Sequence, residues 1–137
     1  MRIAVYIFAI VVIILVLTDA YVRLAPTDMA RWHQPITASQ NVDQANGAIR
    51  VRQAQPAAFA HVDKAMQALP RTKVLAGAVD EGLITYVTRS RLWGFPDYTT
   101  VQYSDGMLKL FGRARFGTSD LGVNAARLGD ILATIEG

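Results

Sequence analysis

The residue types most able to bind a ligand are concentrated in one stretch, 117–124, which reads Gly-Thr-Ser-Asp-Leu-Gly-Val-Asn. Two glycines, a hydroxyl pair, Asp120 and Asn124 lead into a segment whose apolar spacing predicts a final helix. The unpaired N–H groups at a helix N-terminus favour anions. Ser119, Asp120 and Asn124 are therefore candidate ligand-binding residues, with Asn124 as the expected N-cap.

Arginines follow a period of two in three segments that we expect to be strands: Arg50 and Arg52, Arg89 and Arg91, and Arg113 and Arg115. Because side chains alternate across a strand, each pair lies on one face of its own strand. If the pairs align, the open face of the sheet is basic and suits phosphate, carboxylate or anionic headgroups. Solubility and edge protection are the simpler explanation. A structural ion pair of Asp120 with Arg113 or Arg115 is the interpretation we rank first for that carboxylate.

Signs of catalysis are weak. The chain has two histidines and no cysteine, and neither His33 nor His61 stands in a metal-spaced cluster or beside a serine motif. A hydrolase would need Asp97 and Asp120 as paired carboxylates, which the sequence does not place together. We predict no catalytic residues, no metal and no cofactor, and favour a non-enzymatic role.

The N-terminus decides which solvent surrounds the protein. Residues 3–17 form an apolar run, and its continuation to Val22 gives about 20 residues, the length that spans a bilayer core. A cleaved signal peptide is the alternative, but the candidate cleavage sites are poor, so we favour a retained anchor in the lipid bilayer over Ile3–Val22. Counting Lys and Arg on the two sides does not settle the orientation.

The chain after the anchor is long enough for one domain. We expect an anchor at 1–23, a connector at 24–46 that is interrupted by Pro26 and Pro35, and a domain at 47–137. The net charge is +3, which does not indicate nucleic acid. Trp32 is expected to dock on the domain or at the lipid headgroups.

The domain is predicted to be α+β. A strand around residues 49–51 precedes a helix over 56–69, four strands over 73–116 and the final helix. Strands joined by tight turns, such as Ser104-Asp105-Gly106, predict an antiparallel sheet of about five strands, covered on one face by two helices. Trp93 and Phe95, in the loop before one strand, are expected to cap the core.

The stretches 93–97, Trp-Gly-Phe-Pro-Asp, and 112–124, Gly-Arg-Ala-Arg-Phe-Gly-Thr-Ser-Asp-Leu-Gly-Val-Asn, together with Arg127, resemble domain of unknown function family 1499. The resemblance extends from about residue 47 to the C-terminus. It implies a small bacterial protein with an N-terminal membrane anchor, and it marks Arg115, Ser119, Asp120 and Asn124 as the motif to probe. It carries no activity.

The leading hypothesis is a membrane-anchored, non-catalytic binding module for an anionic ligand or a cell-envelope protein. It would be a single-pass protein of the bacterial inner membrane with its domain on the periplasmic side. The candidate ligand-binding residues are Arg91, Arg113, Arg115, Ser119, Asp120 and Asn124. The alternatives are a structural or assembly subunit of a membrane complex and, less favoured, a carboxylate-dependent hydrolase.

Overall fold

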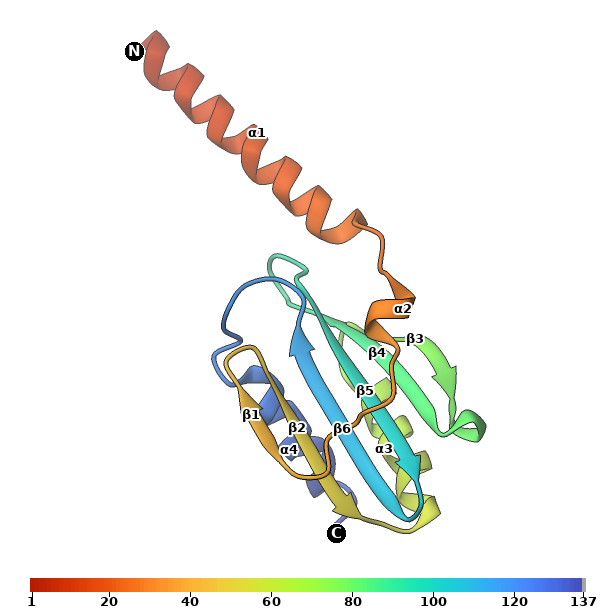
Figure 1. Cartoon of the computed structure of the whole chain (residues 1–137). Helices are drawn as coiled ribbons and strands as arrows, with labels where there is room; N and C mark the ends of the chain where they lie inside the picture. Colours follow the sequence, from red (N-terminus) through yellow and green to blue (C-terminus); the bar gives the residue numbers. More distant parts are fainter. Residues whose placement is uncertain (137) are drawn as a thin grey trace.

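One long apolar helix, α1 (Arg2–Leu24), leads into an α+β domain (Figure 1). This computed structural model describes residues 1–136, so Gly137, the last residue of the predicted domain, lies outside the described residues. By length and composition α1 could cross a membrane, and a signal sequence near an N-terminus has the same properties. The most apolar part of α1 is not buried against the domain, which leaves that surface available to lipid.

The domain is built on a six-stranded sheet in the order β1-β2-β6-β5-β4-β3, with every neighbouring pair antiparallel. The strands are β1 (Val42–Gln44), β2 (Gly47–Gln53), β3 (Thr72–Ala78), β4 (Leu83–Arg89), β5 (Pro96–Ser104) and β6 (Met107–Ala114). The antiparallel α+β prediction is confirmed, but the expected number of about five strands is one too few. The extra strand, β1, falls within the predicted connector, and its three residues are too few and too polar to show a strand pattern.

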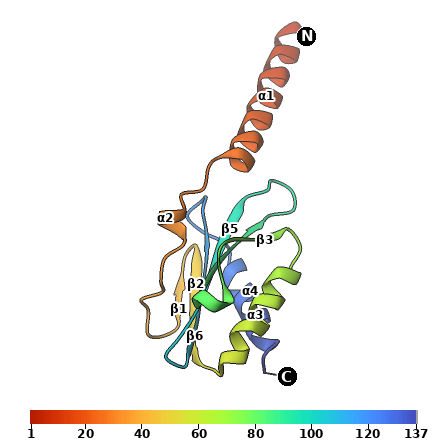
Figure 2. The same ribbon diagram turned by 90° about the vertical axis from the view of Figure 1, so that its right-hand side faces the viewer.

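Two helices, α3 (Pro56–Ala68) and α4 (Val123–Ala133), cover one face of the sheet, as predicted (Figure 2). Each buries an apolar stripe against the sheet: Phe59, Val62 and Met66 from α3, and Leu128 and Ile131 from α4. A short 3-10 turn, η1 (Val79–Glu81), joins β3 to β4. The spacing of these apolar residues at helical period places the core between helices and sheet.

The connector covers the opposite face of the sheet. It contains one helical turn, α2 (Met29–Trp32), and then runs across the strands (Figure 1). Trp32 is only 7% exposed, and its ring lies 4.3 Å from the ring of Tyr98. The backbone N–H of Ile36 donates to the side chain of Gln102, and His33 Nδ1 lies 2.8 Å from Thr85 Oγ1. Of the two positions expected for Trp32, on the domain or at the lipid headgroups, the structure shows the first.

The aromatic residues of the β4–β5 loop do not cap the core. Trp93 and Phe95 remain 41% and 39% exposed, and Leu92 is 75% exposed. The prediction that they are tucked in is therefore wrong. The helices and the connector already cover both faces of the sheet, which leaves no uncovered core for these side chains to cap. The loop instead extends past the end of the strands towards α1 (Figures 1 and 2).

We expect two glycine substitutions to change stability in opposite directions. In Gly112→Ala, the added methyl group would lie 2.8 Å from Asn124 Oδ1 and 3.2 Å from Asn124 Cβ, so Asn124 at the start of α4 must shift, at a cost of about 1–3 kcal/mol. In Gly129→Ala, the methyl group meets nothing within 4 Å, and the helix gains about 0.5–1 kcal/mol. Thermal unfolding of the full chain in detergent micelles measures both; equal melting temperatures would refute this packing of α4.

Candidate functional site

The three arginine pairs do not share one face of the sheet. Strand pairing sets Arg50 opposite Leu110 and Arg52 opposite Leu108, so both arginines point to the side of the helices. Arg52 accordingly pairs with Glu136 at 2.6 Å, while Arg50 pairs with Asp43 at the sheet edge. The prediction of a single open basic face is wrong, because it required the same orientation in β2 as in β6.

Arg113 lies between the sheet and the connector. Its guanidinium donates to the Trp32 carbonyl at 2.6 Å, to Thr100 Oγ1 at 2.8 Å and to the Phe111 carbonyl at 3.0 Å. Only 8% of the residue is exposed, and this burial lowers the pKa of Arg113 to about 10. No carboxylate forms an ion pair with it within residues 1–136. The charge is balanced only by carbonyl and hydroxyl oxygens and by the rings of Phe111 and Trp32, at 4.4 and 5.4 Å.

Two other cations bind the connector in the same way. Lys109 Nζ donates to the Ile36 carbonyl at 3.2 Å, and Arg115 Nη2 donates to the Pro26 carbonyl at 3.0 Å. Arg115 Nη1 also lies 3.3 Å from the hydroxyl of Tyr98. Arg113 and Arg115, which were expected on an open face of the sheet, therefore hold the connector against the sheet together with Lys109.

A cavity of about 340 Å³ remains between the connector, the β1–β2 turn and the end of β6. Its polar lining consists of three arginines and three side-chain amides: Arg31, Arg113, Arg115, Gln34, Gln44 and Asn46. We call it the arginine cleft. In the described part of the chain no acidic residue lines it. It joins two predicted ligand-binding residues, Arg113 and Arg115, with Arg31, which was not among the predicted ligand-binding residues.

Asp120 caps α4 instead of pairing with an arginine. Its carboxylate accepts the backbone N–H groups of Gly122 and Asn124, at 2.9 and 3.0 Å, and Asn124 Nδ2 at 2.9 Å. The predicted ion pair with Arg113 or Arg115 is therefore wrong. The predicted N-cap is also wrong, because the left-handed Gly122 is the N-cap and Asn124 is buried in the first turn.

Asn124 brings together the two carboxylates that the sequence could not place. Its Nδ2 also lies 3.3 Å from Asp97 Oδ2, which accepts Arg127 Nη1 at 3.3 Å. Burial raises the pKa of Asp97, and Arg127 and Asn124 only partly offset this effect. Burial also acts to raise the pKa of Asp120, but hydrogen bonds from Asn124 and Gly122 outweigh it and lower that pKa.

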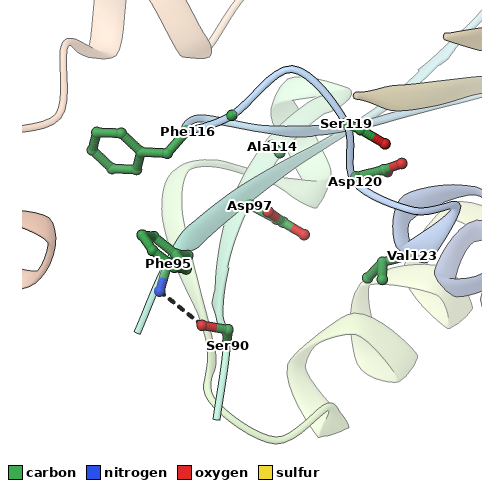
Figure 3. Close-up of a pocket in the computed structure, with 9 residues that line it drawn as sticks. Ser90, Phe95, Asp97, Ala114, Phe116, Ser119, Asp120 and Val123 are labelled. Carbon is green, nitrogen blue, oxygen red and sulfur yellow. Dashed lines mark hydrogen bonds between the residues drawn. The ribbon is translucent and has the colours of Figure 1, made fainter. Parts of the chain in front are cut away.

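These carboxylates border a second cavity, of about 360 Å³, beside the β4–β5 loop (Figure 3). Asp97, Ser119 and Asp120 supply polar atoms, while Phe95 and Phe116 give it apolar walls. Ser119 Oγ accepts the N–H of Leu121 at 3.2 Å. Three of the predicted residues, Ser119, Asp120 and Asn124, thus form one cluster that is separate from the lining of the arginine cleft.

Arg91 lies apart from both groups. It is exposed at the start of the β4–β5 loop and lines a third cavity, of about 270 Å³, with four other cations: Arg23, Arg71, Lys73 and Arg89. We call this cavity the basic pocket. Its cations come from three separate stretches of the chain, at residues 23, 71–73 and 89–91, and only the pair Arg89 and Arg91 was singled out in the sequence. Within residues 1–136 no group of three or more His, Cys, Asp or Glu side chains is placed to hold a metal ion.

Residues 24–135 match the model of a family described as "Protein of unknown function (DUF1499)". The chain belongs to this family. The match covers the connector as well as the sheet and helices, in agreement with the packing of the connector on the sheet. No curated protein matches the chain. Membership of DUF1499 supplies no activity for these cavities.

We expect Asp120→Asn to destabilise the protein by about 1 kcal/mol at neutral pH, because an amide replaces the charged acceptor at the start of α4. The folded state lowers the pKa of Asp120 below its ordinary 3.8, so its stabilisation is complete above that value. It is lost as the pH falls through the lower, folded-state pKa. Urea unfolding over a pH series measures the difference between variant and parent.

The matched control is Asp130→Asn, an exposed carboxylate on the same helix. It should change stability little at any pH. A loss for Asp120→Asn that equals the loss for Asp130→Asn, or one that grows as the pH falls, contradicts the cap.

Proposed function

We propose that this member of DUF1499 is a membrane-anchored binding module whose arginine cleft binds an anionic group, a phosphate or a carboxylate. The observation that carries the proposal is the buried guanidinium of Arg113, which has no carboxylate partner within residues 1–136. Burying an unpaired charge is costly. An anion in the adjoining cleft would supply the missing countercharge.

The chemistry of the cleft suits an oxyanion. A guanidinium presents planar N–H donors that match phosphate and carboxylate oxygens. Arg31 and Arg113 both line the cleft, and the amides of Gln34, Gln44 and Asn46 add neutral donors. Arg31 is exposed, and its side chain contacts the Trp32 ring at 4.8 Å but forms no hydrogen bond or ion pair within residues 1–136, so its N–H donors are available to a ligand.

Membrane anchoring is the second part of the proposal. We infer that α1 is retained as a single span of the bacterial inner membrane, with the domain on the periplasmic side. The contacts of its last turn with the domain support retention: Val22 is 4% exposed, and its carbonyl accepts Arg89 Nη1 at 3.4 Å. The ring of Tyr21 also packs edge-on against Phe116. Cleavage after Val22 would remove these contacts.

A structural or assembly role is the competing function, because the same cations bind the connector. Arg113 makes three hydrogen bonds and Arg115 makes two, all of them to carbonyl and hydroxyl oxygens of the chain itself. Arg31 separates the two functions, since its side chain makes no hydrogen bond or ion pair within residues 1–136. Its removal should leave the fold intact and weaken only anion binding.

The carboxylate-dependent hydrolase has less support. Asp97 and Asp120 are neighbours, as a hydrolase would need, but both oxygens of Asp120 accept backbone N–H groups of α4. Asp97 is bonded to Asn124 and Arg127. The cap of α4 explains the position of Asp120, and the bonds from β5 to Asn124 and Arg127 of α4 explain the position of Asp97. Neither carboxylate requires a reaction to explain it.

The test is stabilisation of the full chain in neutral detergent micelles by inorganic phosphate, with sodium chloride matched for ionic strength. Binding to the folded state raises the melting temperature with ligand concentration. Arg31→Gln should weaken the apparent phosphate affinity about tenfold, because a charged hydrogen bond contributes about 1.5–3 kcal/mol. Lys64→Gln, which removes an exposed cation from α3, is the matched control and should retain the parent affinity.

Equal phosphate affinity in the parent and Arg31→Gln would overturn the cleft as the site, and no stabilisation beyond that of chloride would overturn anion binding. The same titration with dihexanoyl phosphatidylglycerol distinguishes the source of the anion. Tighter binding of this lipid than of phosphate, lost in Arg31→Gln, identifies a headgroup; equal binding identifies a free anion.

A further inference from the structure

The β4–β5 loop, residues 90–95, is fastened to the last turn of α1. Arg23 Nη2 donates to the Leu92 carbonyl at 3.2 Å. From the other side, Arg89 Nη1 donates to the carbonyls of Gly94 and Val22, at 2.9 and 3.4 Å. Figures 1 and 2 place the loop at the end of the domain that is nearest to α1. The position of the loop relative to α1 is therefore set by hydrogen bonds to its Leu92 and Gly94 carbonyls.

The same loop exposes a group of large apolar side chains. Leu92, Trp93 and Phe95 retain 75%, 41% and 39% of their accessible surface. Tyr21 and Leu24, on the last turns of α1, are also well exposed. A cluster of exposed apolar residues of this kind marks an interaction surface, whereas single exposed residues carry no such meaning.

Cations lie directly beside this apolar group. The basic pocket is lined by Arg23, Arg71, Lys73, Arg89 and Arg91, and no carboxylate lines it in the part of the chain that the structure describes. Asp19 pairs with Arg23 at 2.8 Å, one turn back along α1, and Arg71 Nε binds the Arg89 carbonyl. Lys73 and Arg91 form no ion pair within residues 1–136. These two side chains are free to bind phosphate oxygens.

We propose that the β4–β5 loop docks in the bilayer interface, with Trp93 at headgroup level and the basic pocket on the phosphates of anionic lipids. This inference rests on α1 as a retained anchor, which is part of the proposed function. Residues 3–22 of α1 are about 30 Å long, the thickness of the hydrocarbon core, so the span ends where the loop is attached. Trp at the interface and Arg or Lys near anionic headgroups are the combination that binds a membrane surface.

The arrangement favours the bilayer over a protein partner. The loop is bonded to the residues at which α1 leaves the apolar run, so a membrane that holds α1 must also meet Leu92 and Trp93. A protein partner would have to enter the space between domain and headgroups. The mixture of exposed apolar and basic side chains suits an interface with hydrocarbon on one side and phosphate on the other.

Tryptophan fluorescence tests the proposal directly, because the chain has only Trp32 and Trp93. Trp32 is buried under the connector, whereas Trp93 is exposed on the loop. The full chain is reconstituted in vesicles of phosphatidylcholine and phosphatidylglycerol that contain lipids brominated near the glycerol backbone or near the chain ends. Shallow bromine should quench the emission about twofold more strongly than deep bromine, since an interfacial Trp lies near the glycerol level. Trp93→Phe should abolish the quenching.

The charge of the basic pocket is tested with Arg91→Glu. Quenching of Trp93 should increase with the fraction of phosphatidylglycerol in the parent and in Lys64→Glu, a matched reversal on α3, and should not increase in Arg91→Glu. Equal increases in both variants would overturn the headgroup contact.

Quenching that survives Trp93→Phe, or that is absent although α1 resists carbonate extraction, would overturn the docked loop. Extraction of the chain by carbonate would instead overturn the anchor, whereas failed phosphate binding by the arginine cleft would leave the loop result unchanged.

Discussion

The bond between the Arg113 guanidinium and the Trp32 carbonyl determines how the parts of this protein fit together. It joins the middle of the sheet to the connector, 81 residues earlier in the chain. With it in place, Trp32 is buried on Tyr98 and the connector becomes a layer of the domain. A buried cation that is bonded only to neutral groups is an expensive way to hold a segment. The anion binding that we propose for the arginine cleft beside it would offset this cost.

The two faces of the sheet are covered by different means. On one face, α3 and α4 bury apolar stripes, and the hydrophobic effect holds them there. On the other, hydrogen bonds from β6 and β5 hold a connector that has little regular structure. Asn124 then ties the β6–α4 loop to β5 by bridging Asp97 and Asp120. Hydrogen bonds thus fix the loops near α1. They also hold the last turn of α1 in one position on the domain, through Arg89 and the Leu92 carbonyl.

Much of the fold could be predicted from residue patterns, because a period of two or 3.6 reports directly on a half-buried strand or helix. The stripe of α3, the stripe of α4 and the turn before β6 were all predictable in this way. Arg50 and Arg52 were assigned to the wrong face because alternation gives each strand two phases, and only the pairing with β6 selects one. Docking of Trp32 was one of two expected alternatives, but the path of the connector over the sheet could not be predicted, since it depends on bonds to carbonyl groups, which carry no sequence signal. The candidate site was split for the same reason: Arg31 and Arg113 meet only after the connector has docked.

Hydrogen exchange of the connector amides, in the full chain and in Arg113→Met, tests the central claim most directly. The N–H groups of Ile36 and His33 are bonded, to the Gln102 side chain and to the Met29 carbonyl, so they should exchange slowly in the parent. In Arg113→Met they should exchange much faster, while the buried amides of β5 keep their protection. Equal protection of the connector in both proteins would show that it is held without Arg113, and would contradict the account.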